Sequence, residues 1–62
     1  MEKTIYDRVK EIALRRGLTI SAIESQAKIA NGTISGWKTS KPFADTLKRV
    51  ADVLEVSMEE LL

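Results

Sequence analysis

The chain has 62 residues and contains neither cysteine nor histidine. This length allows one domain with one small core, and the composition excludes disulfides, zinc sites with thiolate or imidazole ligands, and catalysis by cysteine or histidine. All ten Lys and Arg residues lie in residues 1–51 together with five acids, whereas residues 52–62 carry four acids and no base. Such a separation suits a protein that turns one face toward phosphate, although ordinary surface charge gives the same pattern.

The first predicted element is a helix over residues 5–16. Thr4 is a good N-cap, Asp7 places an acid in the first turn, and Gly17 can end the helix in the left-handed conformation. Apolar residues recur at helical spacing along it, at Ile5, Val9 and Ile12.

A second helix follows, and two residues compete for its cap. Ser21 with Glu24 three residues later fits a capping box. Thr19 as the cap instead places Leu18 and Ile23 at the two ends of a hydrophobic staple, so we expect the helix to begin after Thr19.

A third helix is expected from Asn31 to about Lys38 or Thr39, after a tight bend. Ile34 and Trp37 fall on one face and are interpreted as core residues. The positions around them carry short polar residues, glycines and a lysine: Asn31, Gly32, Thr33, Ser35, Gly36 and Lys38. A helix with a core stripe and such an outer face can lie in a DNA major groove.

Two further helices complete the prediction. Apolar residues at i, i+3, i+4 and i+7 predict a fourth helix over residues 44–54: Leu47, Val50, Ala51 and Leu54. Ser57 and Glu60 form a capping box, with Val56 and Leu61 as a staple, so a fifth helix begins there. It ends after one turn, as expected if residues 1–62 are the N-terminal domain of a longer regulator. No segment reads as a strand, so the predicted fold class is all-α.

The spacing and residue types of residues 18–37 resemble the Cro and lambda-repressor-like (XRE-type) helix-turn-helix family. The run NGTISGW, residues 31–37, is similar to a subgroup of bacterial and phage repressors, and the wider pattern covers nearly the whole chain. The resemblance implies a compact five-helix DNA-binding domain over residues 1–62, with the helix-turn-helix at its second and third helices.

Two groups of candidate DNA contacts follow. Candidates for base edges are Asn31, Gly32, Thr33, Ser35 and Gly36, and candidates for phosphates are Thr19, Ser21, Lys38, Thr39, Ser40 and Lys41. The amide of Asn31 can pair with adenine through N6 and N7, or it can cap the third helix instead. The two glycines allow close approach of the backbone to the groove, or they carry no readout. The other polar residues alternatively form a solvated face and loop, and Thr19 a cap alone.

Several positions depart from the resembled family. Ile20 stands where a phosphate-binding glutamine is common, and Ala13 and Lys38 stand where an Arg–Glu pair often joins the first and third helices. Glu24 occupies a usually small position, so it needs a partner if buried, for which Lys28 and Lys38 are candidates. Lys28 often has a glycine counterpart, and a left-handed conformation there would cost roughly 1–2 kcal/mol.

The predicted function is sequence-specific binding of a double-stranded DNA operator by a transcriptional regulator, a phage or prophage-type repressor acting as a homodimer. The alternative is a protein-interaction module, such as an antitoxin or adaptor, that keeps the fold with weak or no DNA binding. The modest net charge and the two glycines favour this alternative. No enzymatic activity, metal or cofactor is expected. Without a long apolar run, we also expect no membrane span, no signal peptide and a cytoplasmic location.

Overall fold

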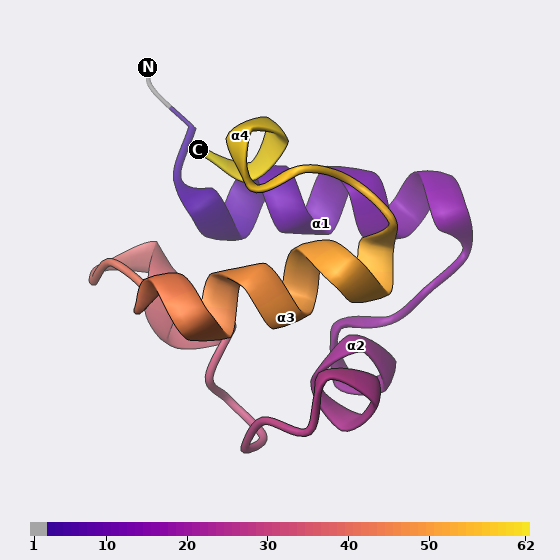
Figure 1. The fold of residues 1–62 in the computed structure, drawn as a ribbon, viewed down its shortest axis with the longest axis horizontal. Helices are drawn as coiled ribbons and strands as arrows, with labels where there is room; N and C mark the ends of the chain where they lie inside the picture. Colours follow the sequence, from indigo (N-terminus) through magenta and orange to yellow (C-terminus); the bar gives the residue numbers. More distant parts are fainter. Residues whose placement is uncertain (1–2) are drawn as a thin grey trace.

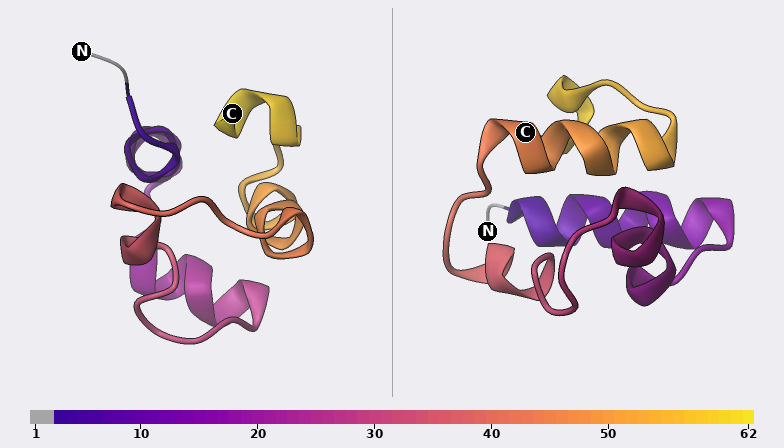
Figure 2. Two further views of the ribbon diagram at one scale, coloured as in Figure 1. Left: turned by 90° about the vertical axis from the view of Figure 1, so that its left-hand side faces the viewer. Right: turned by 60° about the horizontal axis from the view of Figure 1, so that its bottom comes forward.

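The computed structural model describes residues 3–62 and contains four α-helices and one short 3₁₀-helix. In chain order these are α1 (Ile5–Arg16), α2 (Ile20–Ala27), the 3₁₀-helix η1 (Ser35–Lys38), α3 (Ala44–Leu54) and α4 (Met58–Leu61). Helices α1 and α3 lie side by side and run in the same general direction (Figure 1; Figure 2). Helix α2 packs on α3, η1 packs on α1, and α4 packs on both α1 and α3. No strand occurs in residues 3–62.

The first two helices begin and end where local capping signals predict. Thr4 Oγ1 accepts the Asp7 N–H at 3.2 Å, and Asp7 Oδ2 accepts the Thr4 N–H at 3.1 Å. These bonds, the one from the Thr4 backbone above all, hold the pKa of Asp7 below its usual value. Gly17 ends α1 with φ 70°. Thr19 Oγ1 accepts the Ala22 N–H at 3.0 Å, which confirms Thr19 as the cap of α2.

The predictions for α3 and α4 are also confirmed. Helix α3 spans the predicted residues and buries its apolar stripe, and α4 begins after Ser57 with a capping box to Glu60. Leu61 is fully buried, and the partly buried Val56 packs against the same core. Although α4 has only one turn, its single buried leucine therefore joins it to the rest of the domain.

One apolar cluster unites all five elements. Burying a large aliphatic side chain stabilises a fold by about 1.5–3 kcal/mol, and six side chains here are fully buried. Ile34 and Trp37 belong to this cluster, which confirms their interpretation as core residues. Its members are Val9, Ile12, Ala13, Ile23, Ala27, Ile34, Trp37, Leu47, Val50, Ala51, Leu54 and Leu61.

The predicted five-helix count is wrong, because the third α-helix does not form. Residues 31–34 make turns, and only Ser35–Lys38 is helical, as a 3₁₀-helix. Gly32 has φ 90°, whereas an α-helix needs φ near −63°. Gly36 further weakens the helix, since glycine costs about 0.8–1.0 kcal/mol relative to alanine in a helix interior. Two glycines in five residues thus interrupt a helix that the apolar spacing alone predicts.

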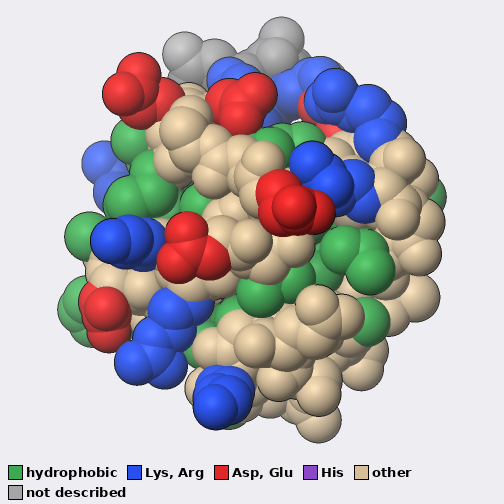
Figure 3. All heavy atoms as spheres, turned by 45° about the vertical axis from the view of Figure 1, so that its right-hand side comes forward, with side chains coloured by type: hydrophobic (Ala, Val, Ile, Leu, Met, Phe, Trp, Pro, Cys, Tyr) green, Lys and Arg blue, Asp and Glu red, His purple; other side chains and the backbone are tan. Residues whose placement is uncertain are grey.

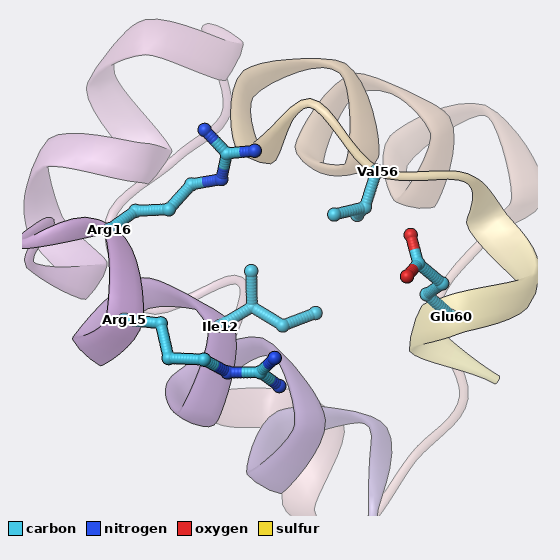
Figure 4. A pocket seen from close by; sticks show the side chains of 5 residues that line it. All are labelled: Ile12, Arg15, Arg16, Val56 and Glu60. Carbon is cyan, nitrogen blue, oxygen red and sulfur yellow. The ribbon is translucent and has the colours of Figure 1, made fainter.

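Charge that is separated along the sequence is mixed in space. Figure 3 shows acidic and basic side chains interspersed on one face of the molecule. Arg16 Nη1 lies 3.1 Å from Glu55 Oε2, so the acidic C-terminal part pairs with the basic end of α1. A hollow of about 410 Å³ lies beside this pair, with Arg15 and Arg16 on one side and Glu60 on the other (Figure 4). Glu55 and Glu60 of the acidic segment therefore lie near the basic end of α1.

In the described part of the chain, no helix combines the length and apolar character needed to cross a bilayer.

Candidate nucleic-acid interface

The bend after α2 is a left-handed helix cap formed by a lysine. Lys28 has φ 59° and ψ 44°, so the left-handed conformation considered for this position is the one it adopts. The Lys28 N–H donates to the Ser25 carbonyl at 3.2 Å, and the Ile29 N–H donates to the Glu24 carbonyl at 3.0 Å. This pattern of closing bonds ends the helix and turns the chain sharply. The bend thereby leads directly into residues 31–38, which we call the reading segment.

Glu24 joins α2 to the reading segment. Its side chain is only 4% exposed, and Glu24 Oε2 accepts the N–H groups of Gly32 and Ile34, both at 3.0 Å. The prediction that Lys28 or Lys38 would partner this carboxylate is therefore wrong. Backbone amides satisfy it instead, because the turn presents two N–H groups that no helical carbonyl accepts.

The candidate base-contacting residues are displayed unevenly. Asn31 and Ser35 are exposed, whereas Thr33 is half-buried and its Oγ1 donates to the Ala30 carbonyl at 2.7 Å. No hydrogen bond from the Asn31 side chain occurs within residues 3–62, and the cap role considered for it is filled by Glu24. The Asn31 amide is thus left available, while Thr33 offers its oxygen lone pairs and methyl group.

The backbone conformation favours glycine at one of the two glycine positions of the reading segment, but not at the other. Gly32 is in the left-handed region, where a Cβ is strained. Gly36 is not, and a Cβ added to it would meet no other atom of the described chain within 4 Å. Neither backbone conformation nor internal packing therefore requires glycine at position 36.

The end of the reading segment is held on α1. Trp37 is 5% exposed in the core, and Lys38 Nζ lies 4.7 Å from the centroid of the Tyr6 ring. A cation over an aromatic face is attracted by about 0.5–1 kcal/mol at exposed sites. This contact joins Lys38 to α1 through Tyr6 rather than through Ala13, and it fixes the direction of a predicted phosphate contact.

The predicted phosphate contacts after η1 gather around one hollow. Lys38, Thr39, Ser40 and Lys41 line a space of about 450 Å³ together with Lys3 and Thr4 from the start of α1. Ser40 Oγ donates to the Gly36 carbonyl at 2.9 Å, so this hydroxyl closes η1 instead of pointing freely outward. Lys41 and Thr39 are exposed. The hollow thus has lysines and hydroxyl groups around an apolar lining that includes Ile5, Trp37 and Leu62, and it joins segments far apart in sequence.

Thr19 and Ser21 lie apart from that hollow, at the start of α2. Both are exposed, and Thr19 already accepts the Ala22 N–H. Figure 1 and the right panel of Figure 2 place the turn at residues 31–34 between the start of α2 and the loop after η1. The two groups of predicted phosphate contacts therefore flank the exposed turn.

A family model described as the Cro/C1-type helix-turn-helix DNA-binding domain matches residues 8–62. The chain belongs to this family. No curated protein and no solved structure gives a significant match. The match covers α2, the bend and the whole reading segment, which in this Cro/C1-type domain is a turn followed by a 3₁₀-helix.

Sequence reasoning about this Cro/C1-type domain missed Tyr6 and the partners of Glu24, both of which shape the interface. Tyr6 was not singled out, although Tyr6, Val9 and Ala13 follow the i, i+3, i+7 spacing of a face turned toward the protein. Glu24 was recognised as unusual, but its partners are backbone atoms eight and ten residues later. Backbone partners leave no sequence signal, so only the fold identifies them.

Proposed function

We propose that this domain binds a specific double-stranded DNA operator through residues 31–36 and acts as a phage or prophage-type transcriptional repressor. The observation that carries the proposal is the exposed Asn31, Ser35 and Gly36 around the buried Ile34, within a segment of the Cro/C1-type family. Short polar groups on such a segment can reach base edges, while the core residues between them fix its orientation.

The proposed contacts divide into two roles. Asn31 reads a base pair through its free amide, and Ser35 and Thr33 contribute further base contacts. The Lys38–Lys41 loop and the start of α2, with Thr19 and Ser21, contact phosphates on either side and set the register without reading sequence. The hollow beside Lys41 also has Lys3 and Lys38 in its lining, and these lysines would supply most of the salt-dependent affinity.

The dimensions of the domain favour two copies on one operator. Its extents are 29 × 22 × 18 Å, so a single copy covers less than one turn of B-DNA, about 34–36 Å. We propose that a homodimer assembles on DNA, with one reading segment for each half-site and half-site centres about 34 Å apart.

The test begins with selection of bound duplexes from a random library, using the longest available form of the protein. We expect an enriched palindromic motif. Asn31→Ala should then weaken binding to that motif by about 1–3 kcal/mol, relax one or two base-pair preferences and leave the salt slope unchanged. Because Asn31 makes no cap bond, its loss should leave the melting temperature unchanged. Asn31→Asp should lose specific binding as well.

Lys41→Ala provides the contrasting variant. It should weaken binding to all duplexes about equally and reduce the slope of log affinity against log salt by about one. Lys48→Ala, which removes an exposed lysine on α3 outside the hollow, is the matched control and should change neither quantity. A selection that yields no motif, with Lys41→Ala and Lys48→Ala indistinguishable, would contradict the proposal and favour the protein-interaction alternative.

A further inference from the structure

We propose that Glu24 is the positioning residue of the reading segment, and that sequence discrimination depends on its carboxylate although it does not face DNA. This inference rests on the proposed function. The carboxylate projects from α2 and accepts the N–H groups of Gly32 and Ile34, each at 3.0 Å. These two residues bracket Thr33 and adjoin Asn31 and Ser35, so one side chain determines where three candidate base contacts lie.

The start of the reading segment needs an external acceptor because no helical carbonyl precedes Gly32 and Ile34 to accept their N–H groups. Inside a helix, each N–H group after the first turn donates to a carbonyl four residues earlier. Here η1 is preceded by turns, and its N-cap residue, Ile34, has an apolar side chain that cannot accept a hydrogen bond. The Glu24 carboxylate replaces those missing acceptors with two charge-assisted hydrogen bonds, which are roughly twice as strong as neutral ones.

Burial makes this attachment selective for one arrangement. A carboxylate that is 4% exposed is costly unless it is hydrogen-bonded. Any shift of residues 32–34 away from α2 therefore leaves a buried charge without partners, in addition to breaking two bonds. The neighbouring lysines do not substitute, because Lys28 lies exposed in the bend and Lys38 lies over Tyr6. The turn is consequently held in a single position relative to α2.

The far end of the segment is held independently. Trp37 is buried in the core and Lys38 lies over Tyr6, neither of which involves Glu24. Loss of the carboxylate should therefore loosen the backbone of residues 31–34, while the buried side chains of Ile34 and Trp37 keep η1 on α1. This predicts a local loosening rather than unfolding, and a loss of base preference rather than of phosphate attraction.

The experiment compares Glu24→Gln, which keeps the size of the side chain, with Glu59→Gln, which removes one carboxylate from an exposed site on α4. Amide hydrogen exchange is followed by NMR, and binding to the selected operator and to an unrelated duplex is measured over a range of salt. In Glu24→Gln, the Gly32 and Ile34 amides should exchange roughly tenfold faster, because neutral hydrogen bonds replace charge-assisted ones. Core amides such as Val9 and Val50 should change far less. Preference for the operator over the unrelated duplex should fall roughly tenfold with an unchanged salt slope.

Three outcomes decide the matter. Uniformly faster exchange throughout α1, α3 and the reading segment would show only general stabilisation and overturn the proposal. Local loosening of Gly32 and Ile34 with unchanged base preference would also overturn it. If the unaltered protein prefers no duplex, the proposed function fails, and the exchange data alone decide whether Glu24 positions this segment. Glu24→Ala in sucrose, which favours compact states, repeats the comparison if the Gln variant unfolds.

Discussion

Replacing Gly36 with alanine should change stability and DNA binding in opposite directions. Gly36 lies in η1 with φ outside the left-handed region, and an added Cβ meets no protein atom within 4 Å. Alanine should therefore fit without strain and gain about 0.5–1 kcal/mol over glycine, which loses more backbone freedom on folding. For a domain of this size, that gain corresponds to a rise in melting temperature of about 2–8 °C.

Operator affinity should fall in the same variant. If the backbone at position 36 approaches the floor of the groove, the new methyl group holds the reading segment away from the bases. We expect a loss of about tenfold or more, equal to about 1.4 kcal/mol. Thermal unfolding followed by circular dichroism measures the first effect, and fluorescence anisotropy with a labelled operator measures the second.

Gly32→Ala is the matched control for Gly36→Ala. Because Gly32 has φ 90°, alanine there should lower the melting temperature. Unchanged operator affinity in a stabilised Gly36→Ala would refute the reasoning and show that position 36 does not approach DNA. A lower melting temperature in Gly36→Ala would refute the structural half of the argument.

Two further substitutions test the caps. Lys28→Gly relieves about 1–2 kcal/mol of left-handed strain in the folded state, but glycine raises the conformational entropy of the unfolded chain, which costs about 0.4–1 kcal/mol of stability. Thermal unfolding should therefore show a net gain of about 0.5–1 kcal/mol in the free energy of unfolding. A loss would mean that the Lys28 side chain makes a stabilising contact. Because the pKa of Asp7 is lowered in the folded protein, its ionised form stabilises the fold fully at pH values above 3.8, the ordinary pKa of Asp. This contribution is lost as the pH falls below 3.8 and through the lower pKa of the folded state. In Asp7→Asn, the melting temperature should therefore fall less between about pH 6 and about pH 2 than it does in the unaltered protein. An identical fall in both proteins would exclude a stabilising role for ionised Asp7.

Local signals were sufficient for most of the fold. Thr4 with Asp7, Thr19 and Ser57 each cap a helix through atoms within three residues of themselves, so the caps are legible in the chain. The apolar spacing of α3 likewise identified its buried face, because a helix repeats its surface every 3.6 residues. These elements depend on neighbours in sequence and need no knowledge of the rest of the molecule.

The candidate site was only partly predictable, because some of its contacts join residues that are far apart in the sequence. The exposed Asn31 and Ser35 and the buried Ile34 and Trp37 could be assigned from spacing, since residues three apart share a face in a 3₁₀-helix as well as in an α-helix. The backbone conformation of residues 31–34 could not be assigned, because the spacing of apolar residues does not indicate a positive φ at Gly32. The partners of Lys38 and Glu24 were missed because Tyr6 and the Gly32 and Ile34 amides come close only in the folded chain.

Residue spacing and capping motifs were therefore enough to predict the all-helical class, four of the helical segments, the core and the family. The tertiary structure decided how the reading segment is held. Glu24 stands on a different element from the two amides it binds, and Tyr6 stands on a different element from Lys38. The strength of such contacts depends on distance and burial in space, and neither quantity is encoded in the spacing of residues along the chain.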